Sequence, residues 1–170
     1  MLSSLYISAI TNYLIMSNLY QNNPLLGTWK LISIKAILPD GTVNNEAFGT
    51  NPIGYITYTV EGKMMVMFSK SERQLLSGNS ASPLTSAIHS VPIEERAEAF
   101  STFNSYAGSY TLDGDKVIHH VEIASIPNRI GKNLTRTFTI NENQVTLKTP
   151  PSRSDDIPKI FELTWERIKS

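Results

Sequence analysis

The sequence predicts an all-β protein, an antiparallel up-and-down barrel of about eight strands with one amphipathic helix at the barrel mouth. From Leu25 onward, short runs rich in Val, Ile, Thr and Tyr alternate apolar and polar residues with a period of two. Turn residues separate these runs, and only one stretch has helical spacing. A single helix suits the opening of a barrel better than the face of a sheet, so we favour a barrel over a sandwich.

Eight runs have the length and composition of strands: 26–38, 53–60, 63–69, 107–112, 116–125, 133–140, 144–149 and 159–168. Three of the joints are tight hairpins, at Gly62, at Asp113–Gly114 and around Asn141. Because such turns reverse the chain within a few residues, consecutive strands should be antiparallel neighbours.

One interruption separates the third and fourth runs. Residues 70–91 are rich in serine and irregular, and a loop of this length is either a lid or binding loop or a surface insertion. The stretch 92–106 then has helical spacing, with one apolar face made of Ile93, Ala97, Phe100 and either Phe103 or Asn104.

Composition and charge exclude several classes of partner. The chain has 170 residues, of which 41% are hydrophobic, which is enough for one domain with its own core. Lysine plus arginine equals aspartate plus glutamate, so no net charge attracts nucleic acid or acidic lipid. Because there is no cysteine, disulfides, thiolate catalysis and cysteine metal sites are excluded.

The first residues do not resemble a targeting or membrane segment. The apolar stretch that ends at Met16 is short, contains polar residues and has no preceding Lys or Arg. We therefore expect residues 1–24 to be a mobile extension and residues 25–170 to form the barrel domain. The expected protein is a cytoplasmic monomer or homodimer with no membrane association.

Alternation along the strands predicts which side chains face inward. In 133–140, the threonines share one face and Arg136 lies on the opposite, core side. In 159–168, Arg167 lies on the same side as Trp165. In 116–125, His119 faces inward and His120 faces outward.

The adjacent histidines do not predict a metal site. Neighbours on a strand point to opposite faces, so His119 and His120 cannot hold one ion together, and His89 lies on the irregular loop. His120 is predicted to bond a surface group across the strands.

Two interpretations of His119 remain open. It is either a neutral imidazole bonded to a barrel tyrosine or backbone carbonyl, or a polar group at the wall of a ligand cavity. Arg136 favours a cavity, because a buried guanidinium needs an acceptor and the strands offer no inward carboxylate. The acceptor is water, a ligand oxygen, or the carboxylate of Glu46, Glu94 or Glu98.

Sequence motifs at both ends of the predicted barrel resemble a known superfamily. "GTWKL" at residues 27–31 and "TWER" at 164–167 resemble the ends of calycin barrels, the superfamily of lipocalins and fatty-acid-binding proteins. The resemblance implies that Arg167 lies across Trp29 at the closed end of the barrel, a cation–π contact.

Longer segments are similar to the bacterial and fungal lipocalin-like domain family, over Leu25 to Ile168. They are "LLGTWKLIS", "NPIGYITYTVEGKMMV", "AEAFSTFNSYAGSYTLDGDKVIHHVEIASIPN", "TRTFTI" and "LTWER". This resemblance implies a lipocalin-like barrel with a hollow interior that binds small molecules. The chain departs from the family pattern at "KMMVMF" and at "NRIG", and both positions could tune the ligand pocket.

We predict that the barrel binds a small, mostly apolar molecule with an oxygen-bearing polar end. Leu147 is expected in the apolar wall. The predicted ligand-binding residues are Tyr55, Met64, Val66, Phe68, Phe100, Phe103, Tyr106 at the end of the helix, Tyr110, His119, Arg136 and Phe138.

Two alternatives come from different functional classes. One is a cofactor-independent isomerase or cyclase of a biosynthetic intermediate, with His119 as general acid or base and Arg136 stabilising an oxyanion. The other is an interaction or structural protein with a filled barrel and no cavity. The sequence contains no P-loop, no dinucleotide-binding glycine motif and no "GxSxG" motif, so we expect no cofactor and no metal.

Overall fold

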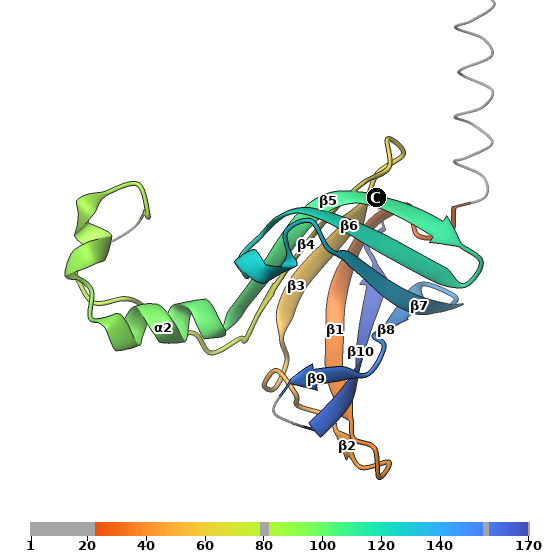
Figure 1. Ribbon diagram of the computed structural model, residues 1–170, viewed down its shortest axis with the longest axis horizontal. Coiled ribbons are helices and arrows are strands. Elements are labelled where there is room, and N and C mark those ends of the chain that lie inside the picture. The colour runs from red at the N-terminus through yellow and green to blue at the C-terminus, as the bar shows by residue number, and fades with distance from the viewer. Residues whose placement is uncertain (1–22, 79–81, 155–156, 170) are drawn as a thin grey trace, which may run out of the picture.

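The computed structural model describes residues 23–78, 82–154 and 157–169 (Figure 1). Eight of its strands form a closed antiparallel barrel, which confirms the predicted fold class. Each barrel strand pairs with the next one along the chain, and pairing between the first and last strands closes the cylinder. The barrel strands are β1 (Gly27–Ile37), β3 (Ile53–Tyr58), β4 (Lys63–Ser69), β5 (Phe103–Asp113), β6 (Lys116–Ala124), β7 (Asn133–Asn141), β8 (Gln144–Lys148) and β10 (Ile157–Arg167).

Short elements extend the barrel. Strand β2 (Val43–Asn44) pairs with β1, and β9 (Ser152–Ser154) pairs with β10. Helix α2 (Ile93–Ser101) and the 3-10 turns η1 (Ser86–Ser90) and η2 (Pro127–Arg129) lie in the connections. No helix within the described ranges is long and apolar enough to cross a membrane.

The predicted helix is too long at its C-terminal end. It ends at Ser101, and Phe103 begins β5, which pairs with β4 from Phe103 opposite Ser69 to Ser109 opposite Lys63. Thr102 ends the helix by donating its backbone N–H to the carbonyl of Glu98. The prediction extended the helix because Phe103 continues its apolar spacing, whereas pairing with β4 decides for a strand.

Helix α2 does not cover the barrel along its length. Figure 1 shows it extending away from the strands, and no residue of the helix is buried. Ile93 and Phe100 on its apolar face are 67% and 53% exposed. Its last turn alone reaches the barrel opening.

A bulge in β1 resets the side-chain alternation. The register with β10 shifts between Leu31 and Ser33, which makes Ile32 the extra residue. Strict alternation from Trp29 would turn Ser33 inward. The bulge instead buries Ile34, at 5% exposure.

The seam between β1 and β10 confirms the contact implied by the family resemblance. The Arg167 guanidinium carbon lies 4.0 Å from the centre of the Trp29 ring, and the Arg167 guanidinium donates to the carbonyls of Pro24 and Leu26. The Trp29 indole donates to the carbonyl of Leu25 at 2.8 Å. Trp29 is fully buried, so this cluster forms part of the core.

Two residues that we assigned to the extension contact the barrel. Asn23 donates to the hydroxyl of Tyr110 at 2.7 Å, and Pro24 accepts from Arg167. The rest of the predicted mobile extension, residues 1–22, lies outside the described residues.

Candidate functional site

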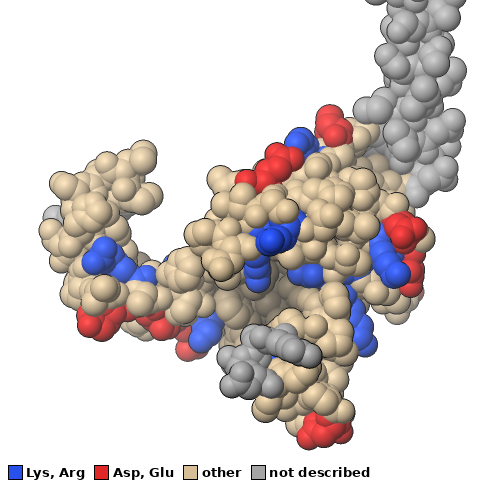
Figure 2. All heavy atoms as spheres, in the orientation of Figure 1, with Lys and Arg blue, Asp and Glu red and all other residues tan. Residues whose placement is uncertain are grey.

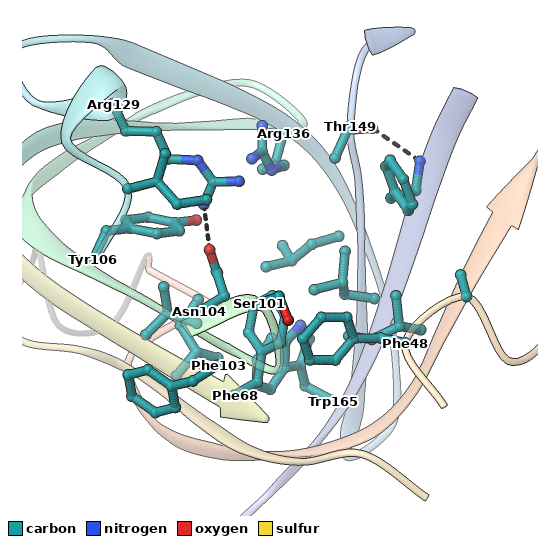
Figure 3. Close-up of a pocket in the computed structure, with 18 of the residues that line it drawn as sticks. Phe48, Phe68, Ser101, Phe103, Asn104, Tyr106, Arg129, Arg136, Thr149 and Trp165 are labelled. Carbon is teal, nitrogen blue, oxygen red and sulfur yellow. Dashed lines mark hydrogen bonds between the residues drawn. The ribbon is translucent and has the colours of Figure 1, made fainter. Parts of the chain in front are cut away.

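The barrel contains a cavity of about 280 Å³ with a mainly apolar wall (Figure 3). This cavity contradicts the filled-barrel alternative. Figure 2 shows the molecule hollowed at the centre of this face, with Lys or Arg atoms beside the hollow. Apolar side chains from six barrel strands, α2 and the loops form the wall: Ile34, Ala47, Phe48, Ile56, Val66, Phe68, Phe100, Phe103, Ile126, Leu147, Phe161, Leu163 and Trp165.

Two arginines, Arg129 and Arg136, line the cavity on the same side as Tyr106 (Figure 3). Arg136 projects from β7, as alternation along that strand predicts. Its guanidinium donates to the carbonyl of Thr135 at 2.8 Å. The described lining residues include no carboxylate.

The carboxylates that the sequence offered as acceptors for Arg136 form no ion pair with it. They are those of Glu46, Glu94 and Glu98. Among the described residues, the ion pairs are Lys63–Glu122 and Lys148–Glu162. A bound molecule can therefore supply negative charge to this end of the cavity.

Turn η2 positions the second arginine. The Arg129 guanidinium donates to the side-chain oxygen of Asn104 at 2.7 Å and lies 5.7 Å from the centre of the Tyr106 ring. Backbone bonds between Val121 and both Gly131 and Lys132 fold this connection back onto β6. Burial lowers the pKa of Arg129, and the charge of Arg136 adds to that effect.

His119 lies in the core beside the cavity and does not line it. Its Nε2 is 2.8 Å from the hydroxyl of Tyr58, and its Nδ1 is 3.0 Å from the hydroxyl of Tyr106. Burial, with a smaller contribution from Arg136, lowers the pKa of His119 to about 3, so its imidazole is neutral at physiological pH. This arrangement confirms the interpretation as a neutral imidazole bonded to barrel tyrosines.

His120 faces outward, as predicted. It bonds across the strands to the hydroxyl of Thr111 at 3.0 Å and to the side-chain oxygen of Asn133 at 2.8 Å. No group of three or more metal-ligating side chains in the described part of the chain could hold an ion.

The structure divides the predicted ligand-binding residues into two groups. Six of them line the cavity: Val66, Phe68, Phe100, Phe103, Tyr106 and Arg136. Phe100 comes from the last turn of α2, whose Ala99 carbonyl accepts from Arg73 at 3.0 Å. Their contact with a ligand remains a prediction.

The other predicted residues do not line the cavity, for identifiable reasons. Tyr55 is 44% exposed, because Gly54, Ile56 and Tyr58 take the inward positions of β3. Met64, like His119, is fully buried in the core. Tyr110 donates to the carbonyl of Thr59 at 2.9 Å, and Phe138 packs against the core cluster.

Sequence reasoning missed other residues of the site. Tyr58 follows from the same alternation that places Ile56 inward. Arg129 lies in the "NRIG" departure from the family pattern, and that departure was the available signal. Asn104 was placed on the helix, whereas it lies on β5. No described residue of the loop 70–91 lines the cavity, and its role as a lid or binding loop or as a surface insertion stays open.

One buried donor at the cavity wall has no partner. The indole Nε1 of Trp165 makes no hydrogen bond within the described residues, and Trp165 is fully buried. Buried polar groups are normally bonded, so this indole N–H is an exception in the core.

Solved structures and a family model are similar to this chain. A lipocalin-like protein from Bacteroides uniformis matches with a TM-score of 0.41 and 10% identity, over 86% of this chain and all of that one. A mutant of the fluorescent protein UnaG matches with a TM-score of 0.32 and 13% identity, over 85% of this chain and 96% of that one. No curated protein matches. The lipocalin-like domain family matches residues 26–168, and the chain belongs to this family.

Proposed function

We propose that the protein binds a small, mostly apolar molecule inside the barrel, with an oxygen-bearing end against Arg129 and Arg136. One observation supports this proposal above the others. Two guanidinium groups line a mainly apolar cavity whose described lining contains no carboxylate. Cationic groups at an apolar wall lose solvation, and an oxygen of the ligand would restore their interactions.

The apolar remainder of the cavity supports the other half of the proposal. Ligand pockets are typically apolar concavities with a few polar groups that set orientation. Aromatic rings such as Phe48 and Phe68, which contact each other edge to face at 5.2 Å, provide such a wall.

The isomerase or cyclase alternative has less support. A general acid or base must reach the reacting atom within hydrogen-bond distance. His119 does not line the cavity, and tyrosine hydroxyls occupy both of its ring nitrogens. We therefore favour binding without chemical change.

Mass spectrometry of compounds retained from a metabolite extract of the source cells tests the proposal. We expect the wild-type protein to retain a compound unchanged. Arg136→Ala should bind that compound about 10- to 100-fold more weakly, because a hydrogen bond to a charged group is lost. His120→Ala is the matched control, since His120 bonds only on the outer face.

Two results would contradict the proposal. Equal retention by wild type and Arg136→Ala would remove the arginine from the binding site. A compound that the protein converts to an isomer, in a manner that requires His119, would replace binding with catalysis.

A further inference from the structure

We infer that the polar end of the cavity takes an apolar carboxylate, and that the buried pair Tyr58 and His119 makes Tyr106 a hydrogen-bond donor toward it. This inference rests on the proposed function and names the chemical class of its ligand. It also gives Tyr58 and His119 a positioning role, although neither lines the cavity.

The hydrogen-bonded chain Tyr58–His119–Tyr106 holds a fixed number of protons. A neutral imidazole has one N–H donor and one acceptor nitrogen. Burial raises the pKa of both tyrosines, so each keeps its hydroxyl proton. The two contacts of His119 therefore have opposite directions: one tyrosine donates to the ring, and the other accepts from it.

The surroundings of Tyr58 decide which tyrosine donates. Tyr58 is 1% exposed, and the Nε2 of His119 is its hydroxyl's hydrogen-bond partner among the described residues. If Nε2 carried the proton, the Tyr58 hydroxyl would be a buried donor without an acceptor, which is unfavourable. Tyr58 therefore donates to Nε2, and the N–H at Nδ1 donates to the oxygen of Tyr106.

This direction leaves the proton of Tyr106 unpaired. Tyr106 lines the cavity, and its oxygen already accepts from His119. Its hydroxyl proton has no acceptor among the described residues, so an acceptor in the cavity would complete its bonding. If the imidazole proton were on Nε2 instead, Tyr106 would donate to Nδ1 of His119 and would present no proton to a ligand.

The two arginines determine the charge of that acceptor. Burial raises the pKa of Tyr106, and the positive charges of Arg136 and Arg129 act against this rise, so both cations lie within electrostatic reach of the hydroxyl. Figure 3 shows the three side chains on one side of the cavity. Together they form an end rich in hydrogen-bond donors, where the side-chain oxygen of Asn104 already accepts from Arg129.

A carboxylate fits this end better than neutral groups do. It accepts several hydrogen bonds, including paired ones from a guanidinium, and it supplies negative charge. An alcohol would place its own donor among donors, and a carbonyl would leave the cations uncompensated. The apolar wall requires that the rest of the molecule be hydrocarbon-like.

Calorimetric titration with decanoate and decanol separates the acid from a matched neutral molecule. We expect wild type to bind decanoate at least about tenfold more tightly than decanol, because bonds to charged groups are the stronger ones. Tyr106→Phe should remove most of this preference. Tyr58→Phe should reduce it about threefold or more, since the His119 proton is then no longer held at Nδ1.

Tyr110→Phe is the control for Tyr58→Phe. Tyr110 packs against Tyr58 with ring centres 5.0 Å apart, but its hydroxyl bonds to Asn23 and Thr59 and not to His119. We expect Tyr110→Phe to prefer decanoate over decanol as strongly as the wild-type protein does. Near-ultraviolet circular dichroism of both variants checks their folding.

Nitrogen NMR of His119 in the wild-type protein tests the tautomer without any substitution. The inference predicts the proton on Nδ1, and a proton on Nε2 would overturn it. Equal affinity for decanoate and decanol would also overturn it while leaving the proposed function intact. Failure of both probes to bind would contradict the proposed function itself.

Discussion

His119 and His120 are adjacent in the sequence but have different chemical environments. His119 is fully buried between two tyrosine hydroxyls, whereas His120 bonds Thr111 and Asn133 on the outer surface. Strand geometry causes the difference, because successive side chains point to opposite faces. A change of one position therefore separates a core group from a surface group.

The burial of His119 predicts a pH dependence of stability. Its pKa falls from 6.5 to about 3 in the folded protein, through burial and then Arg136. Below pH 6.5 the unfolded chain binds a proton that the folded chain does not. The contribution of the buried neutral His119 to the free energy of unfolding is therefore full above pH 6.5. Below pH 6.5 it decreases by up to about 1.4 kcal/mol per pH unit, until the pH reaches the folded pKa.

Urea unfolding at a series of pH values measures this slope. We expect His119→Gln, which cannot titrate, to have a shallower decrease in the free energy of unfolding below pH 6.5 than wild type. His120→Gln is the control and should keep the wild-type slope. Identical slopes for wild type and His119→Gln would show that His119 does not titrate on unfolding.

Among the elements, the hairpin of β5 and β6 shows how a bulge requires a particular residue. The register shifts between Ala107 and Gly108, which pair with Ile123 and Val121. A Cβ atom at Gly108 would lie 1.9 Å from the carbonyl oxygen of His120, which only glycine avoids. The bulge lies between Tyr106 and His119, so it affects the alignment of the two bonded side chains.

Gly108→Ala should therefore destabilise the protein. We expect the free energy of unfolding to fall by about 2 kcal/mol or more, because backbone must move to admit the methyl group. Chemical denaturation measures the change, and Ser109→Ala on the same strand is the control. A loss under about 0.5 kcal/mol, as for an ordinary surface change, would contradict the close approach.

The whole molecule depends on the closure of β1 against β10. Their register runs from Trp29 opposite Arg167 to Ile37 opposite Ile160. The segment before β1 completes the seam: Leu25 is fully buried, and the carbonyls of Pro24, Leu25 and Leu26 accept from Arg167 or Trp29. The barrel therefore begins with this segment.

Two truncations locate the start of the folding unit. We expect deletion of residues 1–22 to change the free energy of unfolding by less than about 0.5 kcal/mol, because every strand of the barrel lies after them. Deletion of residues 1–25 should lower it by about 2 to 5 kcal/mol, the range for removing a buried leucine side chain. Equal stability of the two truncated proteins, measured by denaturant unfolding, would contradict the role of Leu25.

The candidate site was predictable only in part, and the strands account for most of that part. Alternation placed Arg136 inward, because it lies in a run of regular period, and Val66 and Phe68, named as apolar ligand-binding residues, also line the cavity. It failed to place Arg129, which lies on a 3-10 turn where no period applies. Tyr55, also predicted to contact the ligand, is 44% exposed and lies on the face of β3 opposite Tyr58.

The sequence alone determined the closed barrel, the family, the Arg167–Trp29 contact and the inward direction of His119 and Arg136. Periodicity predicts the barrel and the inward side chains, whereas the family and the Arg167–Trp29 contact were implied by the resemblance of local motifs. Only the tertiary structure decided that Phe103 begins a strand, that Arg129 joins Arg136, and that Tyr58 and Tyr106 share His119. Pairing and contacts between distant segments set these features, so local periodicity did not predict them.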